Sequence, residues 1–180
     1  MEIVHLSPSL TELSKKLEKY KYEIDLLEET YLITSRWKKP NYFAVLLFVF
    51  IGLVRIIANR TTAIFSFAFA TLLFVDYKVR MNVFNLVNDN LSSVQVSEDS
   101  IHLTYKDESE PMEFTKEKIK SLQTEYTSSG KYCIGSIMLE DNLNVRYQLM
   151  TLIGKKEAEI TALNEELLKL FQSVLLISNQ

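Results

Sequence analysis

The sequence contains few of the residues from which catalytic and metal sites are built. Its 180 residues include one cysteine and two histidines, and these three lie far apart along the chain. This scarcity excludes most metal-ligand clusters and most nucleophile–base pairs. Four glycines and three prolines also leave no room for a glycine-rich phosphate loop or a long flexible linker.

An excess of positive charge is also lacking. The formal net charge is −3 at pH 7, and the sequence pI is about 5.5. Proteins that coat nucleic acid carry a clear basic excess. We therefore expect no direct binding to RNA or DNA.

Apolar residues, in contrast, are concentrated between Tyr42 and Val75. This stretch reads YFAVLLFVFIGLVRIIA, then NRT, and then TAIFSFAFATLLFV. A hydrocarbon core of roughly 30 Å needs about 20 helical residues, so each run is somewhat short and needs interfacial residues to complete it. We predict a two-helix transmembrane hairpin over 42–77. The alternatives are a buried helical hairpin of a soluble core, or one spanning helix with a second helix lying in the interface.

The basic residues around these runs predict an orientation. Arg36, Lys38 and Lys39 precede the first run, and Lys78 and Arg80 follow the second. The connecting turn offers Arg60, with Arg55 about one helical turn before it. By the positive-inside rule both termini are cytoplasmic, as in a two-span protein of a bacterial inner membrane. The lone Cys133 fits a reducing compartment.

Polar and small residues within the apolar runs form a candidate pore or helix-packing site. An arginine at the bilayer centre costs roughly 3 kcal/mol but much less near an interface, so Arg55 either snorkels to the far headgroups or faces other helices. Three small residues of the second run share a helix face that another helix could approach closely, within the hairpin or between subunits. The candidate residues are Arg55, Asn59, Arg60, Ala63, Ser66 and Ala70.

The segment 1–41 has the pattern of a cytoplasmic amphipathic helix. Ser7-Pro8 and the capping box from Ser9 to Glu12 mark its start, and apolar residues then recur at alternating spacings of three and four, as in a coiled coil. This pattern predicts either an oligomer seam or a helix that packs on the C-terminal domain of its own chain. The residues concerned are Leu10, Leu13, Leu17, Tyr20, Ile24, Leu27 and Tyr31.

The segment 78–180 changes to a period of two. Alternation predicts strands over 93–97, 100–106, 112–114, 119–126, 132–140 and 144–153, and one amphipathic helix follows Gly154. Residues 82–91 fit either a first strand or an extension of the second apolar helix. The predicted fold class is an α+β membrane protein: a heptad helix, the transmembrane hairpin, and an antiparallel sheet domain with a C-terminal amphipathic helix.

Several short motifs carry a resemblance to a known family. They are VSEDSI at 96–101, PMEF at 111–114 and the KIKSL step at 118–122, all downstream of the apolar pair. Over residues 42–172 the chain resembles bacterial membrane proteins with a PH-like cytoplasmic domain of the YcxB type. The resemblance implies a PH-like sheet domain and says little about activity, because such modules host many functions.

We find no arrangement of residues that predicts catalysis. His102 alternates with Ile101 and Leu103 and is expected on the solvent side of a strand. The acidic residues at 108, 110 and 113 resemble a solvated rim, and Cys133 fits a strand of the core. We therefore expect no enzyme, no cofactor and no metal.

Two functional hypotheses remain. The first is a non-enzymatic, membrane-anchored, self-associating interaction or scaffold module at the inner face of a bacterial membrane, whose partners are copies of itself or a cytoplasmic protein. The second is an oligomeric pore or effector that permeabilises or depolarises the membrane, as in phage-defence or CRISPR-associated accessory membrane proteins.

Overall fold

The chain folds into two compact units. The computed structural model describes residues 8–27, 29–58, 60–87, 91–106 and 110–175. Unit 1 combines Met1–Trp37 with Val87–Gln180, and unit 2 is the intervening segment Lys38–Leu86. The residues on either side of the apolar stretch therefore belong to one structural unit.

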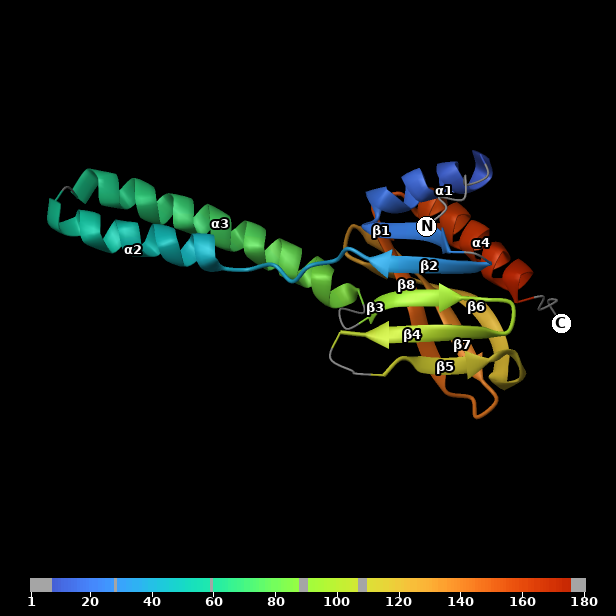
Figure 1. The fold of residues 1–180 in the computed structure, drawn as a ribbon. Coiled ribbons are helices and arrows are strands. Elements are labelled where there is room, and N and C mark those ends of the chain that lie inside the picture. Colours follow the sequence, from blue (N-terminus) through green and yellow to red (C-terminus); the bar gives the residue numbers. More distant parts are fainter. Residues whose placement is uncertain (1–7, 28, 59, 88–90, 107–109, 176–180) are drawn as a thin grey trace. The chain divides into compact units, whose positions relative to one another are not determined.

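The first part of unit 1 is a helix followed by a five-stranded antiparallel sheet (Figure 1). The sheet has the order β1-β2-β3-β4-β5. Strands β2 and β3 are hydrogen-bonded neighbours although unit 2 separates them in sequence, with Ile33 opposite Val94. The elements are α1 (Pro8–Lys19), β1 (Tyr22–Leu27), β2 (Thr30–Ser35), β3 (Leu91–Val96), β4 (Ser100–Tyr105) and β5 (Met112–Thr115).

The second part of unit 1 is a three-stranded antiparallel sheet with a C-terminal helix. Its order is β6-β7-β8, so the predicted single sheet is in fact two sheets. The predicted strands and final helix are confirmed at nearly the expected positions. They are β6 (Ile119–Ser129), β7 (Tyr132–Asp141), β8 (Arg146–Gly154) and α4 (Glu157–Val174), with the short helix η1 (Lys116–Lys118) before them.

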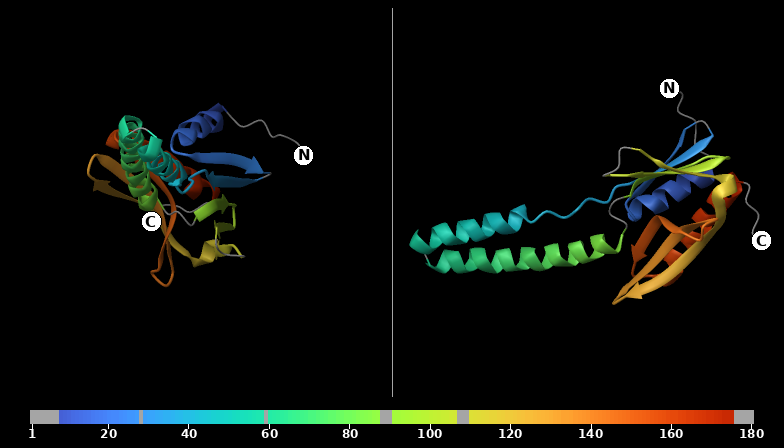
Figure 2. Two further views of the ribbon diagram at one scale, coloured as in Figure 1. Left: turned by 90° about the vertical axis from the view of Figure 1, so that its left-hand side faces the viewer. Right: turned by 90° about the horizontal axis from the view of Figure 1, so that it is seen from below.

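One hydrophobic core joins the elements of unit 1. The apolar face of α4 packs on β6–β8 through Ile160, Leu163, Leu167 and Phe171, all of which are buried. Both sheets and both helices contribute side chains to the same cluster, and Figure 2 shows the helices α1 and α4 beside the two sheets. The period-two and period-3.6 patterns of the sequence correspond to the faces that enter this core.

The predicted continuous heptad helix is wrong. Helix α1 begins at Pro8 but ends at Lys19, and Lys21 adopts a left-handed conformation with φ of 64°. The next residues form the β1–β2 hairpin, in which Tyr22 and Ile24 alternate into the core. Tyrosines and β-branched residues fit a half-buried strand better than a helix, and here that preference prevails over the heptad spacing.

Unit 2 contains two apolar helices that lie side by side, α2 (Phe43–Ala58) and α3 (Arg60–Leu86) (Figures 1 and 2). The predicted pair of membrane-spanning helices is wrong: among the described residues only α3 is long and apolar enough to cross a membrane. At 1.5 Å per residue, the 16 residues of α2 cover about 24 Å, less than the roughly 30 Å of a hydrocarbon core. Residues 82–86 continue α3.

Candidate membrane interface

The small residues of α3 lie in the contact between the two helices of unit 2. Ala63, Ser66 and Ala70 are buried, as the close approach of a second helix requires. Next to this contact, the rings of Phe48 and Phe69 lie 4.7 Å apart. The small-residue face is therefore occupied by α2 of the same chain.

Gly52 allows a further close approach on the other helix. A Cβ atom at this position would lie 2.9 Å from the ring of Phe67, closer than van der Waals contact permits. The two helices therefore interlock through small residues on one and aromatic residues on the other.

Two hydroxyl groups within α3 are satisfied by its own backbone. Ser66 Oγ donates to the carbonyl of Thr62 at 3.1 Å, and Thr71 Oγ1 donates to the carbonyl of Phe67 at 2.9 Å. Such bonds to the preceding turn spare a hydroxyl the cost of an apolar environment. These polar side chains are thus compatible with surrounding lipid.

The outer surface of unit 2 is formed by large apolar side chains. Ile57 is 91% exposed, and Phe43 and Phe65 are each about 70% exposed. In water, so many exposed apolar groups would be unfavourable at about 25 cal/mol per Å². The exposed set between residues 43 and 75 is Phe43, Leu46, Leu47, Phe50, Leu53, Val54, Ile56, Ile57, Ile64, Phe65, Phe69, Leu72, Phe74 and Val75.

Aromatic and charged residues mark one end of this apolar surface. The rings of Tyr42 and Tyr77 meet edge to face, with centroids 6.2 Å apart. Lys78 Nζ lies 5.6 Å from the centroid of Phe74, and Arg80 Nε is 2.8 Å from Asp76 Oδ2. The apolar surface therefore ends at the same level at the start of α2 and within α3.

The residues predicted for a pore or helix-packing site fall on both helices of unit 2. Arg55 is exposed near the end of α2. Asn59 lies outside the described residues, and Arg60 is the first residue of α3. Ala63, Ser66 and Ala70 face α2.

The residues predicted for an oligomer seam lie mainly in the core of unit 1. Leu10, Leu13, Leu17 and Tyr20 are buried, and the lysines beside them connect α1 with α4 through Lys16–Glu166 and Lys19–Glu159 ion pairs. Ile24 is buried in β1 and Tyr31 is partly buried in β2, whereas Leu27 is exposed at the end of β1. Helix α1 therefore packs on its own chain, which is one of the two arrangements that the sequence predicts for this segment.

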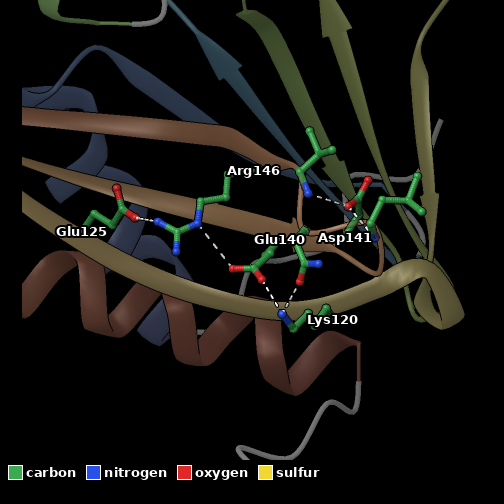
Figure 3. A network of polar contacts seen from close by, with 8 residues as sticks. Lys120, Glu125, Glu140, Asp141 and Arg146 are labelled. Carbon is green, nitrogen blue, oxygen red and sulfur yellow. Dashed lines mark hydrogen bonds and ion pairs between the residues drawn. The ribbon is translucent and has the colours of Figure 1, made fainter.

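A polar network of unit 1 lies on β6–β8 (Figure 3). Glu140 accepts a hydrogen bond from Lys120 at 2.6 Å, and Arg146 Nε lies 3.4 Å from its second oxygen. Arg146 also reaches Glu125 at 2.8 Å. The hydrogen bond from Lys120 and the nearby Arg146 hold the pKa of the Glu140 carboxyl below its usual range. A carboxylate held in its ionised form in this way is a structural group and a poor proton donor.

Asp141 stabilises the turn that follows this network. Its Oδ1 accepts hydrogen bonds from the backbone N–H groups of Leu143 at 2.9 Å and Val145 at 2.8 Å, while Asn144 adopts φ of 63°. The carboxylate therefore fixes the β7–β8 connection.

His102 has polar neighbours without the geometry of a catalytic triad. Its Nε2 lies 2.9 Å from Ser100 Oγ, and the same Nε2 lies 3.8 Å from Glu113 Oε1. A triad needs the serine and the carboxylate on opposite ring nitrogens, so these three residues do not form one.

Cys133 lines a hollow at the tip of the β6–β7 hairpin. The hollow has a volume of about 460 Å³, and Lys131, Tyr132 and Lys155 also line it. Cys133 is partly buried and packs against the edge of the hydrophobic core, close to the core position that its strand pattern predicted. Within the described ranges, no three metal-ligating side chains gather in one place.

Sequence reasoning missed two buried contacts that hold unit 1 together. The hydroxyl of Tyr22 donates to the carbonyl of Thr151 at 3.1 Å and accepts from its N–H at 3.2 Å, which connects the N-terminal hairpin to β8. Gly135 on β7 makes room for Ile160 and Asn164 of α4. Neither contact has a signal in the sequence. The residues that form each contact lie far apart in the chain, and they show no distinctive pattern.

Comparison with protein-family models, with curated proteins and with solved structures yields no match to this chain.

Proposed function

We propose that this chain is a non-enzymatic, membrane-anchored interaction module. Unit 2 inserts into a bilayer, and unit 1 stays in the aqueous phase and binds a protein partner. The exposed apolar surface of α2 and α3 carries the anchoring half of this proposal, because lipid tails are the environment in which that surface is stable. Helix α3 is the one described helix with the length and composition of a span.

In this proposal all of unit 1 lies on one face of the membrane. The polypeptide leaves unit 1 after β2 and returns to it before β3, and these two strands are paired. Unit 2 therefore inserts from the face on which unit 1 lies. Lys38, Lys39, Lys78 and Arg80 lie beside these connections, and basic residues favour the cytoplasmic side of a bacterial inner membrane.

The interaction half of the proposal rests on the seam between α1 and α4. Two hollows lie along it, of about 410 Å³ and 330 Å³, and both are lined in part by Glu166. Leucines and Ala162 contribute apolar surface, and charged residues surround it. Such a mixture suits an amphipathic segment of a partner protein. The likeness to YcxB-type PH-like proteins remains part of the proposal, supported by the C-terminal helix on an antiparallel sheet.

The alternative of an oligomeric pore is not retained. It depended on a free small-residue face and a free heptad seam, and the structure covers the small residues with α2 and most of the seam with unit 1. We expect one chain per particle when the mass of the detergent-solubilised protein is measured by light scattering. A discrete larger assembly would restore self-association.

Carbonate extraction of membranes from expressing cells tests the anchor. We expect the wild-type chain to stay in the pellet. The variant F50Q/F65Q/L72Q, which changes three exposed residues of unit 2, should move to the supernatant, whereas L27Q/Y126Q/L143Q, which changes three exposed residues of unit 1, should remain bound. Complete release of the wild-type chain by carbonate would contradict the anchor.

Site-specific photocrosslinking tests the interaction surface. A photoreactive residue at Ala162, in the α1–α4 seam, should give one defined adduct in cells, and the same residue at Gly130 should not. Equal adducts at both positions, or none at Ala162, would argue against a partner at this seam.

A further inference from the structure

The charge of the chain is divided unevenly between its two units. Unit 2 contains six basic residues and a single acidic one, Asp76. The remainder of the chain contains 14 basic and 22 acidic residues. An anionic bilayer surface therefore repels unit 1 and attracts unit 2.

Two tyrosines locate the end of the apolar surface. Tyr42 directly precedes α2, and its ring contacts Tyr77 of α3. Tyr77 also lies 6.4 Å from the ring of Phe74 within α3. Tyrosines combine an apolar ring with a polar hydroxyl and gather at the level of lipid headgroups. The Tyr42–Tyr77 pair thus marks the headgroup level of unit 2.

Four cations lie immediately beyond this level. Lys38 and Lys39 precede Tyr42 by four and three residues, and Lys78 and Arg80 follow Tyr77. All four side chains are exposed. In the described part of the chain Arg80 is paired with Asp76, while the two lysines before α2 and Lys78 have no acidic partner. Their charges are available to a ligand.

We propose that this headgroup belt, made of Lys38, Lys39, Tyr42, Tyr77, Lys78 and Arg80, binds anionic phospholipid headgroups on the face where unit 1 lies. The inference rests on the proposed anchoring of unit 2 and goes beyond it by naming the lipid class. The tyrosine rings set the depth of insertion, and the cations bind the phosphate groups at that depth. The acidic surface of unit 1 gives no comparable attraction, so lipid selectivity belongs to the belt.

Native mass spectrometry of the full chain in a neutral detergent tests the proposal. Phosphatidylglycerol and phosphatidylcholine are added at equal concentration, and lipid adducts are counted. Each cation near an anionic surface contributes severalfold in affinity, so we expect the wild-type chain to retain phosphatidylglycerol at least about tenfold better. The preference should fall as salt rises from about 50 to about 300 mM, and soluble glycerol 3-phosphate should not compete.

The charge variant K38Q/K39Q/K78Q/R80Q should lose this preference. The matched control K118Q/K131Q/K155Q/K156Q removes four exposed cations from unit 1 and should keep it. Equal retention of both lipids by the wild-type chain, or an equal loss in the control, would overturn the inference.

Flotation of the wild-type chain with pure phosphatidylcholine vesicles tests the anchor separately. Flotation without a lipid preference in the mass-spectrometry test contradicts only the belt. Absence of flotation contradicts the anchor and the belt together.

Discussion

Tyr22 shows how one side chain can connect distant parts of the chain. Its ring is buried between the N-terminal hairpin and β8, and its hydroxyl satisfies both backbone groups of Thr151. Strand β8 is an edge of the three-stranded sheet, so at this position the hydroxyl replaces a neighbouring strand. Burial raises the pKa of the Tyr22 hydroxyl to about 12, because the phenolate would lose its hydration.

We expect Tyr22→Phe to lower the free energy of unfolding by about 1–3 kcal/mol at pH 7, since it leaves a buried N–H and carbonyl without a partner. Urea denaturation would measure this loss, and Tyr132→Phe, on a partly exposed tyrosine, serves as the control with little effect. The neutral Tyr22 hydroxyl contributes fully to the free energy of unfolding below the unfolded pKa of about 10. This contribution is lost as the pH rises through the folded pKa of about 12. The difference between the wild-type chain and the Tyr22→Phe variant should therefore shrink over this range, and a constant difference would show that Tyr22 is not buried as described.

Gly135 is needed because α4 approaches β7 closely. A Cβ atom at this position would lie 2.7 Å from Ile160 Cγ2 and still closer to the Asn164 amide. The side chain of Asn164 is fully buried, and its amide has no hydrogen-bond partner among the described residues. The close approach therefore leaves no space for a methyl group at position 135.

We expect Gly135→Ala to destabilise unit 1 by about 1–3 kcal/mol through overpacking, measured as a lower thermal midpoint. The control is Gly130→Asn: Gly130 has open space around it and φ of 58°, which asparagine tolerates. Equal midpoints for the Gly135→Ala variant and the wild-type chain would mean that α4 packs elsewhere.

Replacing Asn164 with the similarly sized leucine should raise the midpoint, because it removes an unsatisfied polar group.

At the scale of elements, the pairing of α2 with α3 depends on small side chains. We expect Ala70→Leu to separate the two helices, because Ala70 is almost completely buried between them. A disulfide between cysteines introduced at Phe48 and Phe69, whose rings are in contact, would report the separation as slower crosslinking in a C133A background. Leu72→Ile on the exposed surface should leave the rate unchanged, and fast crosslinking in the Ala70→Leu variant would contradict the contact.

The elements of the C-terminal half could be predicted from the sequence. Alternation over 100–106 and the polar turns between strands are local signals, and the structure places strands and a helix there. The sequence does not reveal the hairpin at 22–35, because Ile24, Leu27 and Tyr31 continue the heptad spacing of α1. The segment is rich in tyrosine, isoleucine and threonine, and this composition was the available signal.

The candidate membrane interface can be predicted in part from the sequence. The apolar composition of 42–75 was evident, but periodicity could not show that α2 ends at Ala58 or that α3 continues to Leu86. The sequence does not decide whether Ala63, Ser66 and Ala70 contact a helix of the same chain or a helix of another chain. Only a three-dimensional arrangement could decide this, because both contacts need the same spacing of small residues. The network of Lys120, Glu140 and Arg146 likewise depends on strand register.

For the whole molecule, the position of unit 2 between two paired strands makes it removable. Thr34 of β2 lies opposite Ser93 of β3, so a short Gly-Ser turn can replace Lys38–Leu86 without changing the sheet. We expect the shortened chain to be soluble without detergent and to keep the circular dichroism spectrum and cooperative melting of a folded α+β domain. A noncooperative or aggregated product would show that unit 1 needs the apolar helices to fold.

Because unit 2 lies between two parts of unit 1 in the sequence, the ribosome synthesises it before the larger, C-terminal part of unit 1. Tyr22 and Thr151 are separated by 129 residues, which a ribosome adds in roughly 6 to 26 s at about 5–20 residues per second. In the first part of that interval, until β3 is made, the β1–β2 hairpin has left the ribosome without its sheet partner, and the apolar helices follow it directly. In the proposed topology, delivery of unit 2 to the bilayer begins before unit 1 can close. Nascent chains stalled before β3 should then already be membrane-bound while their first strands are still sensitive to protease.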